Sequence, residues 1–362
     1  MKSFCVLNGP INQRLYEKIG ASSVCAFGER IGVAFADAAQ ADTASTYLCN
    51  GIISAGGTAE NFGIVNESRI PFLIRNYSLS AAFFVGGESL VSVYAHDGRA
   101  LNIHQEKLMA ELIASDDIPS EETGTLLNIN SDYAYRKTLV SAAQSLDGVS
   151  ADVFCSDVNL RVLIRSVMNL SGSDISPKPR FFISQSGFGI SACDESGKVL
   201  KRENLLDICS VCNLESGQSL TVPFSASASL ESVASAHGVM LKRSFEGGDA
   251  PWQKDSVFLV IEVLRNMAVY GSGLSTLSDK LSESFTLRRS FSCSMSPDDV
   301  ADIIPCDEIV TDGESSIYVR HNSGNILLTR CRNLKSYCME VSASDSETAS
   351  ELALEISAAL FA

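Results

Sequence analysis

The stretch 53–101 constrains the fold of this chain most strongly, because elements of helical and of strand periodicity alternate along it. A glycine pair ends its first helix, and the elements predicted after that pair are a strand at 61–65, an amphipathic run at 70–75, an apolar strand at 81–85 and a turn at Asp97-Gly98. Strands that alternate with helices predict a largely parallel sheet covered by helices. Ligands gather at the carboxyl ends of such strands, so the loop after Val85 is the first candidate for a site.

Composition limits the classes of function. The 362 residues predict about two to four domains. The net charge of −15 argues against nucleic acid or an anionic membrane as a partner, because both require a basic surface. No apolar run reaches the length of about 18 residues that a membrane span needs, and the first ten residues are not apolar enough for a secretion signal. Eleven cysteines without a disulfide-framework spacing predict reduced thiols in a cytoplasmic protein.

The motifs Gly63-Ile64-Val65 and 97–101 (DGRAL), in this order with the strand between them, resemble the first domain of the phosphoglucomutase/phosphomannomutase family, the α-D-phosphohexomutases. In that family the loop T-A-S-H-N-P follows the strand, and its serine carries the phosphoryl group that is exchanged with the sugar. Here the loop is Gly86-Gly87-Glu88-Ser89-Leu90. Glu88 takes the nucleophile's place, as a possible charge mimic of phosphoserine, and Ser89 follows as a displaced candidate nucleophile. A tight Gly-Gly turn with solvated polar residues is the alternative.

The resemblance extends in order over nearly the whole chain, with 194–200 (DESGKVL) as a further match. It implies an α/β fold of three similar αβα units with mixed or parallel sheets, followed by a C-terminal α+β domain, around a central cleft. We place domain I at 1–122, a shortened domain II at 123–202, a shortened domain III at 203–281 and domain IV at 282–362.

Glycines in the first domain are interpreted as breaks in regular structure. Gly20 is predicted to stop a helix that starts at Arg14. Through the resemblance, Gly51, Gly56, Gly57 and Gly63 correspond to turn glycines, and their spacing does not match a dinucleotide fingerprint.

The resemblance implies Mg²⁺ as a cofactor, held by three aspartates of a D-G-D-x-D-R motif directly before the hairpin at 190–200. Here the preceding residues 184–189 are SQSGFG, without a carboxylate. A hard divalent cation needs anionic oxygen ligands, and two serines and a phenylalanine do not supply them. We therefore expect no metal ligands and no cofactor in this chain.

The segment 329–336 takes the place of the family's phosphate loop, R-P-S-G-T-E-P. Arg330 matches the leading arginine, and the candidate phosphate-binding set is Arg330, Arg332, Asn333, Lys335 and Ser336. Cations and hydroxyls bind phosphate oxygens, although a charge cluster in a surface loop is also often only solvated. The family's sugar-specificity loop is either deleted here or reduced to Glu246-Gly247-Gly248, with Glu246 as the candidate sugar ligand.

Functions of different classes remain open at the level of sequence. The leading hypothesis is a phosphohexomutase-like protein that has lost Mg²⁺-dependent phosphoryl transfer and acts as a phosphosugar-binding or regulatory paralogue. Its partner would be a phosphorylated hexose, an active mutase or another protein. The alternative is a divergent active phosphoglucomutase/phosphomannomutase that interconverts hexose 1- and 6-phosphates in carbohydrate metabolism through Ser89. A purely structural role in a complex is the third hypothesis.

Overall fold

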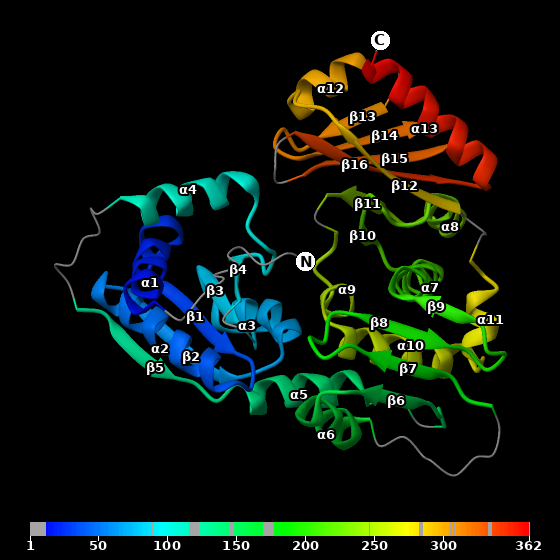
Figure 1. The fold of residues 1–362 in the computed structure, drawn as a ribbon. Helices are drawn as coiled ribbons and strands as arrows, with labels where there is room; N and C mark the ends of the chain where they lie inside the picture. The colour runs from blue at the N-terminus through cyan, green and yellow to red at the C-terminus, as the bar shows by residue number, and fades with distance from the viewer. Residues whose placement is uncertain are drawn as a thin grey trace. The chain divides into compact units, whose positions relative to one another are not determined.

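The computed structural model describes residues 12–87, 90–115, 123–144, 146, 148–168, 177–245, 247–281, 285–304, 306, 308–331 and 335–361. The chain forms two compact units, whose helices and strands are labelled in Figure 1. The first unit contains the residues up to Ala192 together with Lys254–Ile261, and the second contains Cys193–Gln253 together with Glu262–Ala362. No helix in these ranges is long and apolar enough to cross a membrane.

The first unit is built on a five-stranded sheet with the order β4-β3-β1-β2-β5. Its strands are β1 (Arg30–Phe35), β2 (Thr58–Ile64), β3 (Ala81–Val85), β4 (Val91–Ala95) and β5 (Thr125–Asn128). Four strands run parallel, and β4 pairs antiparallel with β3. The predicted strands at 61–65 and 81–85 are confirmed as β2 and β3, whereas β4 was not predicted.

Helices cover both faces of this sheet. α1 (Gln13–Phe27), α2 (Ala39–Ser54) and α4 (Ile103–Ala114) pack with Val33 and Phe83 into one core. After the short 3₁₀ helix η1 (Glu67–Arg69), α3 (Ile70–Tyr77) packs with Phe84 on the opposite face. Successive residues of one strand point to opposite faces, so β1 and β3 contribute to both cores.

Gly20 and Gly51 lie where α1 and α2 pack against each other. α1 continues through Gly20 to Phe27 and Gly51 lies inside α2, so the predictions of a helix stop and of a turn were wrong at these two positions. A methyl group on Gly20 would overlap the carbonyl oxygen of Leu48, and one on Gly51 would overlap that of Glu17. The two helix backbones approach closely because neither glycine has a side chain.

The first unit also contains a second sheet. β6 (Asp152–Cys155) and β7 (Arg180–Ile183) pair in parallel, and β8 (Ile190–Cys193) lies beside β7. The helices of this part of the unit are α5 (Asp132–Ala142), α6 (Val158–Val167) and the first residues of α10 (Ser256–Tyr270). The short helix α9 (Pro251–Lys254) lies at the boundary, with 251–253 in the second unit and Lys254 in the first.

A buried polar cluster connects α5 to the start of α10. The hydroxyl of Tyr135 donates to Oδ2 of Asp255 over 2.5 Å, and Oδ1 of Asp255 accepts from the backbone N–H of Val257. Arg69 pairs with Asp132 and places its guanidinium carbon 4.5 Å from the centre of the Tyr135 ring. Burial raises the pKa of the Asp255 carboxyl to about 6, because the ionised form loses its hydration.

The second unit begins with β9 (Val199–Lys201) and a small α/β layer. In this layer α7 (Arg202–Glu215) and α8 (Ser229–His237) pack on the parallel pair β10 (Leu220–Pro223) and β11 (Leu241–Ser244), and α11 (Leu274–Ser278) lies against α7. Its core contains Leu214, Val222 and Leu230.

The rest of the second unit is an antiparallel sheet with the order β12-β16-β15-β14-β13. The strands are β12 (Phe285–Ser292), β13 (Glu308–Thr311), β14 (Ser316–His321), β15 (Gly324–Arg330) and β16 (Ser336–Ala343). α12 (Pro297–Ile303) and α13 (Ser346–Phe361) cover the face that receives Tyr337 and Met339. This arrangement confirms the predicted α+β pattern, although α12 and β13 were not predicted.

The close crossing of α1 and α2 is tested by the variant Gly51→Ala. We expect the free energy of unfolding in urea to fall by roughly 1–3 kcal/mol, because the added methyl group meets a backbone oxygen of the partner helix. Asn50→Ala, at the exposed neighbouring position of α2, is the matched control and should change stability by less than about 0.5 kcal/mol. Equal effects of the two substitutions would contradict a tight crossing at Gly51.

The buried carboxyl of Asp255 makes a pH-dependent contribution to stability. Its folded-state pKa of about 6 lies above the value of about 3.9 in an unfolded chain, so the folded state holds the proton more tightly. The contribution is therefore fully present below pH ~4 and is lost as the pH rises through ~6. An asparagine at this position would not titrate, so wild type should lose stability relative to Asp255→Asn as the pH rises from ~4 to ~7. Unfolding curves at several pH values measure this difference, and a difference that stays constant or changes in the opposite direction would reject the assignment.

Candidate functional site

The connection between β3 and β4 is a short hairpin. The backbone N–H of Gly86 donates to the carbonyl of Leu90 over 2.7 Å, and Val85 faces Val91 across the two strands. Glu88 and Ser89, the candidate phosphoserine mimic and the candidate nucleophile, lie outside the described residues. The ends of the loop are therefore fixed by the sheet, and the roles of these two side chains stay predictions.

Residues 184–189 form a turn that closes on its own serines. Oγ of Ser184 accepts from the N–H of Gly189 over 2.9 Å and lies 3.1 Å from Oγ of Ser186. The N–H of Gly187 donates to the carbonyl of Ser184, and Gly187 has a φ of +80°. Both serine hydroxyls are thus engaged within the turn.

This turn docks on the segment that follows β2. The N–H of Ser68 donates to the carbonyl of Ser186 over 3.2 Å, and Nδ2 of Asn66 lies 3.4 Å from the carbonyl oxygen of Gln185. Phe188 packs against the α3-side core of the large sheet. The sequence analysis did not identify Asn66 and Ser68. Both follow the carboxyl end of a parallel strand, and that position would have marked them as candidate site residues.

The β15–β16 turn holds the basic residues predicted to bind phosphate. The N–H of Cys331 donates to the carbonyl of Ser336 over 2.7 Å, so the turn begins where Arg330 ends its strand. The guanidinium of Arg330 donates to the carbonyl of Ser294 over 3.0 Å and thereby holds the segment before α12. Lys335 is exposed. The structure brings Arg330, Lys335 and Ser336 to one turn, and Arg332 and Asn333 lie outside the described residues.

The segment after β11 is tied to α9. The N–H of Gly248 donates to Oε1 of Gln253 over 2.7 Å, and the carbonyl of Gly247 accepts from Oγ of Ser244. Glu246, the candidate sugar ligand, lies outside the described residues. The two glycines have a local structural role, and sugar binding by Glu246 stays a prediction.

Comparison with known proteins places the fold. No family model matches the sequence, and no curated protein matches it either. Among solved structures, a phosphoglucomutase/phosphomannomutase family protein from Burkholderia thailandensis aligns with 99% of this chain and 96% of its own, with a TM-score of 0.73 at 12% identity. A putative phosphomannomutase from Thermus thermophilus aligns over 98% and 96%, with a TM-score of 0.68 at 11% identity. The open form of parafusin, a phosphoglucomutase from Paramecium, aligns over 96% and 91%, with a TM-score of 0.61 at 10% identity.

The fold is that of the α-D-phosphohexomutases. The resemblance seen in the order of elements from 53 to 101 is thereby confirmed at the level of the fold.

The Mg²⁺ that the phosphohexomutase fold implies does not fit the residues at 184–189. The side-chain oxygens there are all neutral: the amide oxygen of Gln185 and the hydroxyls of Ser184 and Ser186, which bond to each other and to the turn's backbone. In the ranges that the structure describes, no group of three or more His, Cys, Asp or Glu side chains is arranged to hold a metal ion. Because Mg²⁺ requires anionic oxygens in near-octahedral geometry, we assign no step of a mechanism to it.

The packing of this turn is tested with Gly187→Ala. The substitution forces a side chain onto a left-handed backbone and brings its Cβ into the side chain of Ser68. Gly197→Ala is the matched control, since Gly197 has a φ of +91° but open space around it. Both variants should lose roughly 1 kcal/mol to backbone strain, and Gly187→Ala should lose at least as much again to the clash. Equal losses in urea unfolding would mean that the turn is not packed on Ser68.

Proposed function

We propose that this chain binds a phosphorylated ligand and does not catalyse Mg²⁺-dependent phosphoryl transfer. The observation that carries the proposal is the turn at 184–189, where serine hydroxyls that bond to one another stand in place of metal-binding carboxylates. In phosphoryl transfer, metal ions and cationic clamps supply most of the stabilisation of the transition-state charge. A turn of neutral, internally bonded side chains does not supply that stabilisation.

The β15–β16 turn supports the binding half of the proposal. Arg330, Lys335 and Ser336 lie together there, and the rest of the chain carries a net charge of the opposite sign. In an acidic protein a phosphate needs a local group of cations to overcome the surrounding field. Arg330 donates to the carbonyl of Ser294 with one nitrogen, whereas Lys335 is exposed, so we choose Lys335 for the test of binding.

The proposed ligand class is a phosphorylated hexose. The structural neighbours are described as phosphoglucomutases and phosphomannomutases, which makes glucose 1-phosphate and mannose 1-phosphate the first ligands to test. A protein that binds such a ligand without converting it would act as a sensor or as a regulatory partner of an active mutase.

The test is a calorimetric titration of the full chain with each sugar phosphate, with and without Mg²⁺. Binding should occur equally in both conditions, and Lys335→Ala should weaken it about tenfold, because one charge-assisted contact to phosphate is lost. Lys137→Ala, at an exposed lysine on α5, removes the same charge elsewhere and should leave the affinity unchanged.

Two outcomes would overturn the proposal. Turnover in a coupled mutase assay with Mg²⁺ and a bisphosphate primer, lost in Ser89→Ala, would establish the divergent active enzyme instead. No binding of either sugar phosphate, by a chain whose circular dichroism shows that it is folded, would reject the phosphosugar ligand and favour a structural role in a complex.

A further inference from the structure

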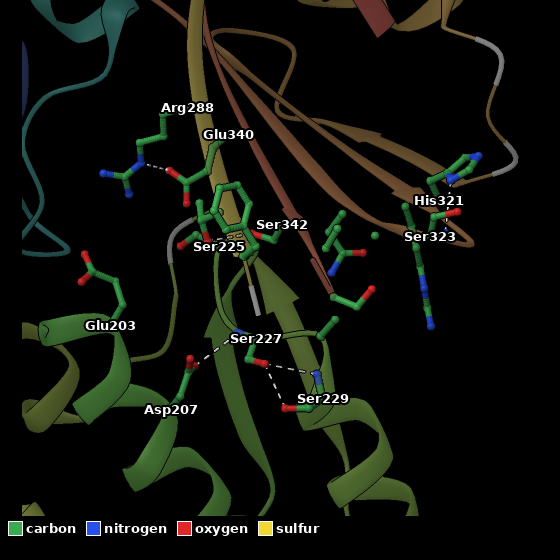
Figure 2. A pocket seen from close by; sticks show the side chains of 18 of the residues that line it. Glu203, Asp207, Ser225, Ser227, Ser229, Arg288, His321, Ser323, Glu340 and Ser342 are labelled. Atoms are coloured by element: carbon green, nitrogen blue, oxygen red, sulfur yellow. Dashed lines mark hydrogen bonds and ion pairs between the residues drawn. The ribbon is translucent and has the colours of Figure 1, made fainter. Parts of the chain in front are cut away.

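A cavity of about 1210 Å³ lies within the second unit (Figure 2). Its walls are the first turns of α7, the β10–α8 connection, the β14–β15 turn and the sheet face that α12 and α13 leave uncovered. Figure 2 shows Glu203 and Asp207 reaching up from α7, with Arg288 and Glu340 on the sheet above them. The cavity adjoins the start of β15 and extends to Glu340, which pairs with Leu327 in the middle of that strand. Arg330 ends β15, three residues beyond Leu327, which at about 3.3 Å per residue is roughly 10 Å along the strand.

The charges around the cavity are balanced. The charged side chains of the lining are three basic and four acidic: Lys201, Arg288 and Arg320, and Glu203, Asp207, Glu308 and Glu340. Both arginines have a carboxylate beside them, since Arg288 bonds Glu340 over 2.7 Å and Arg320 lies 3.4 Å from Glu308. A phosphate that approached either arginine would also meet a carboxylate, so a strongly anionic ligand is disfavoured here.

The remaining polar lining consists mainly of hydroxyl and amide groups. The hydroxyls are Ser225, Ser227, Ser229, Ser323, Ser342, Ser344 and Thr286, and the amides are Asn204, Asn322 and Asn325. Each of these groups both donates and accepts hydrogen bonds, and so does a sugar hydroxyl. In the β10–α8 connection, the Oγ atoms of Ser227 and Ser229 lie 2.9 Å apart, and the N–H of Ser227 donates to Oδ1 of Asp207 over 3.3 Å.

Two further residues complete a surface for a polyhydroxylated ring. Phe285 lines the cavity and is 40% exposed, so its ring offers an apolar face on which the C–H side of a sugar can lie. Asp207 supplies a partly buried carboxyl, and the loss of hydration raises its pKa to about 6. At neutral pH its carboxylate accepts hydrogen bonds from ligand hydroxyls.

We propose that this cavity binds a neutral oligosaccharide. Paired charges disfavour an ion, hydroxyls and amides match sugar hydroxyls, and Phe285 matches the apolar ring face. The volume exceeds the range of roughly 300–1,000 Å³ typical of small-molecule sites, which favours a ligand of several rings over a monosaccharide. The site is separate from the β15–β16 turn, and the proposal does not depend on phosphosugar binding at that turn.

The test is saturation-transfer NMR and calorimetric titration of the full chain with maltotriose, cellotriose and chitotriose. At least one trisaccharide should bind saturably, and Phe285→Ala should weaken that binding roughly tenfold through loss of the stacking face. Ser342→Trp, on the uncovered sheet face, should block the cavity and abolish binding without removing a buried group. Because the two variants act differently, a folding defect in one leaves the other informative.

The controls separate this site from the phosphate cluster. Phe182→Ala, at a phenylalanine of similar exposure in the first unit, and Lys335→Ala should each leave trisaccharide affinity unchanged. Saturating glucose 1-phosphate should not compete. The proposal is overturned if none of the three trisaccharides binds, if Ser342→Trp binds as well as wild type, or if Lys335→Ala or glucose 1-phosphate abolishes binding.

Discussion

Burial of β1 and β3 between two layers of helices is the constraint on which the first unit depends. Residues 31–35 and 81–85 are all buried, so both strands are apolar on both faces except at Arg30, the exposed first residue of β1. The loops at the carboxyl edge of this sheet, which include 65–69 and 86–90, carry polar residues at the place where ligands of such sheets bind. The turn at 184–189 docks on the first of these loops through Asn66 and Ser68.

This separation of core and loop explains how the scaffold and the site can diverge independently. The packing of the sheet does not require carboxylates at 184–189, because hydroxyls of Ser184 and Ser186 satisfy the turn's hydrogen bonds. In this chain the turn therefore keeps its hydrogen bonds without metal-binding carboxylates. The chain shares its fold with solved structures that are only 10–12% identical to it, and we attribute this shared fold to the buried strands. A shared fold does not establish what the loops bind or catalyse.

The two ends of the antiparallel sheet differ in electrostatics. At the β15–β16 turn, Arg330 and Lys335 place two positive charges close together in an acidic protein. An anion needs such local positive charge in order to bind there. Around the start and middle of β15, Arg320 lies beside Glu308 and Arg288 beside Glu340, and the other polar groups of the cavity are mainly hydroxyls and amides. The same sheet thus presents one surface suited to a phosphate and another suited to an uncharged polar ligand.

The sequence by itself determined the alternation of elements, because apolar periodicity reports burial directly. β3 lies at the predicted residues, and the α+β character that the resemblance implied for the last domain is seen in its antiparallel sheet and helices. Only the tertiary structure shows that Gly20 and Gly51 allow α1 and α2 to pack closely. The sequence could not show this, because a glycine is compatible both with a helix end and with a close contact between helices. Tertiary structure also determines that 91–95 form the strand β4, because this segment pairs with the open edge of β3. It likewise determines the cavity, because the walls come from segments more than a hundred residues apart in the sequence. Periodicity is local, whereas contact between distant segments depends on how the whole chain packs.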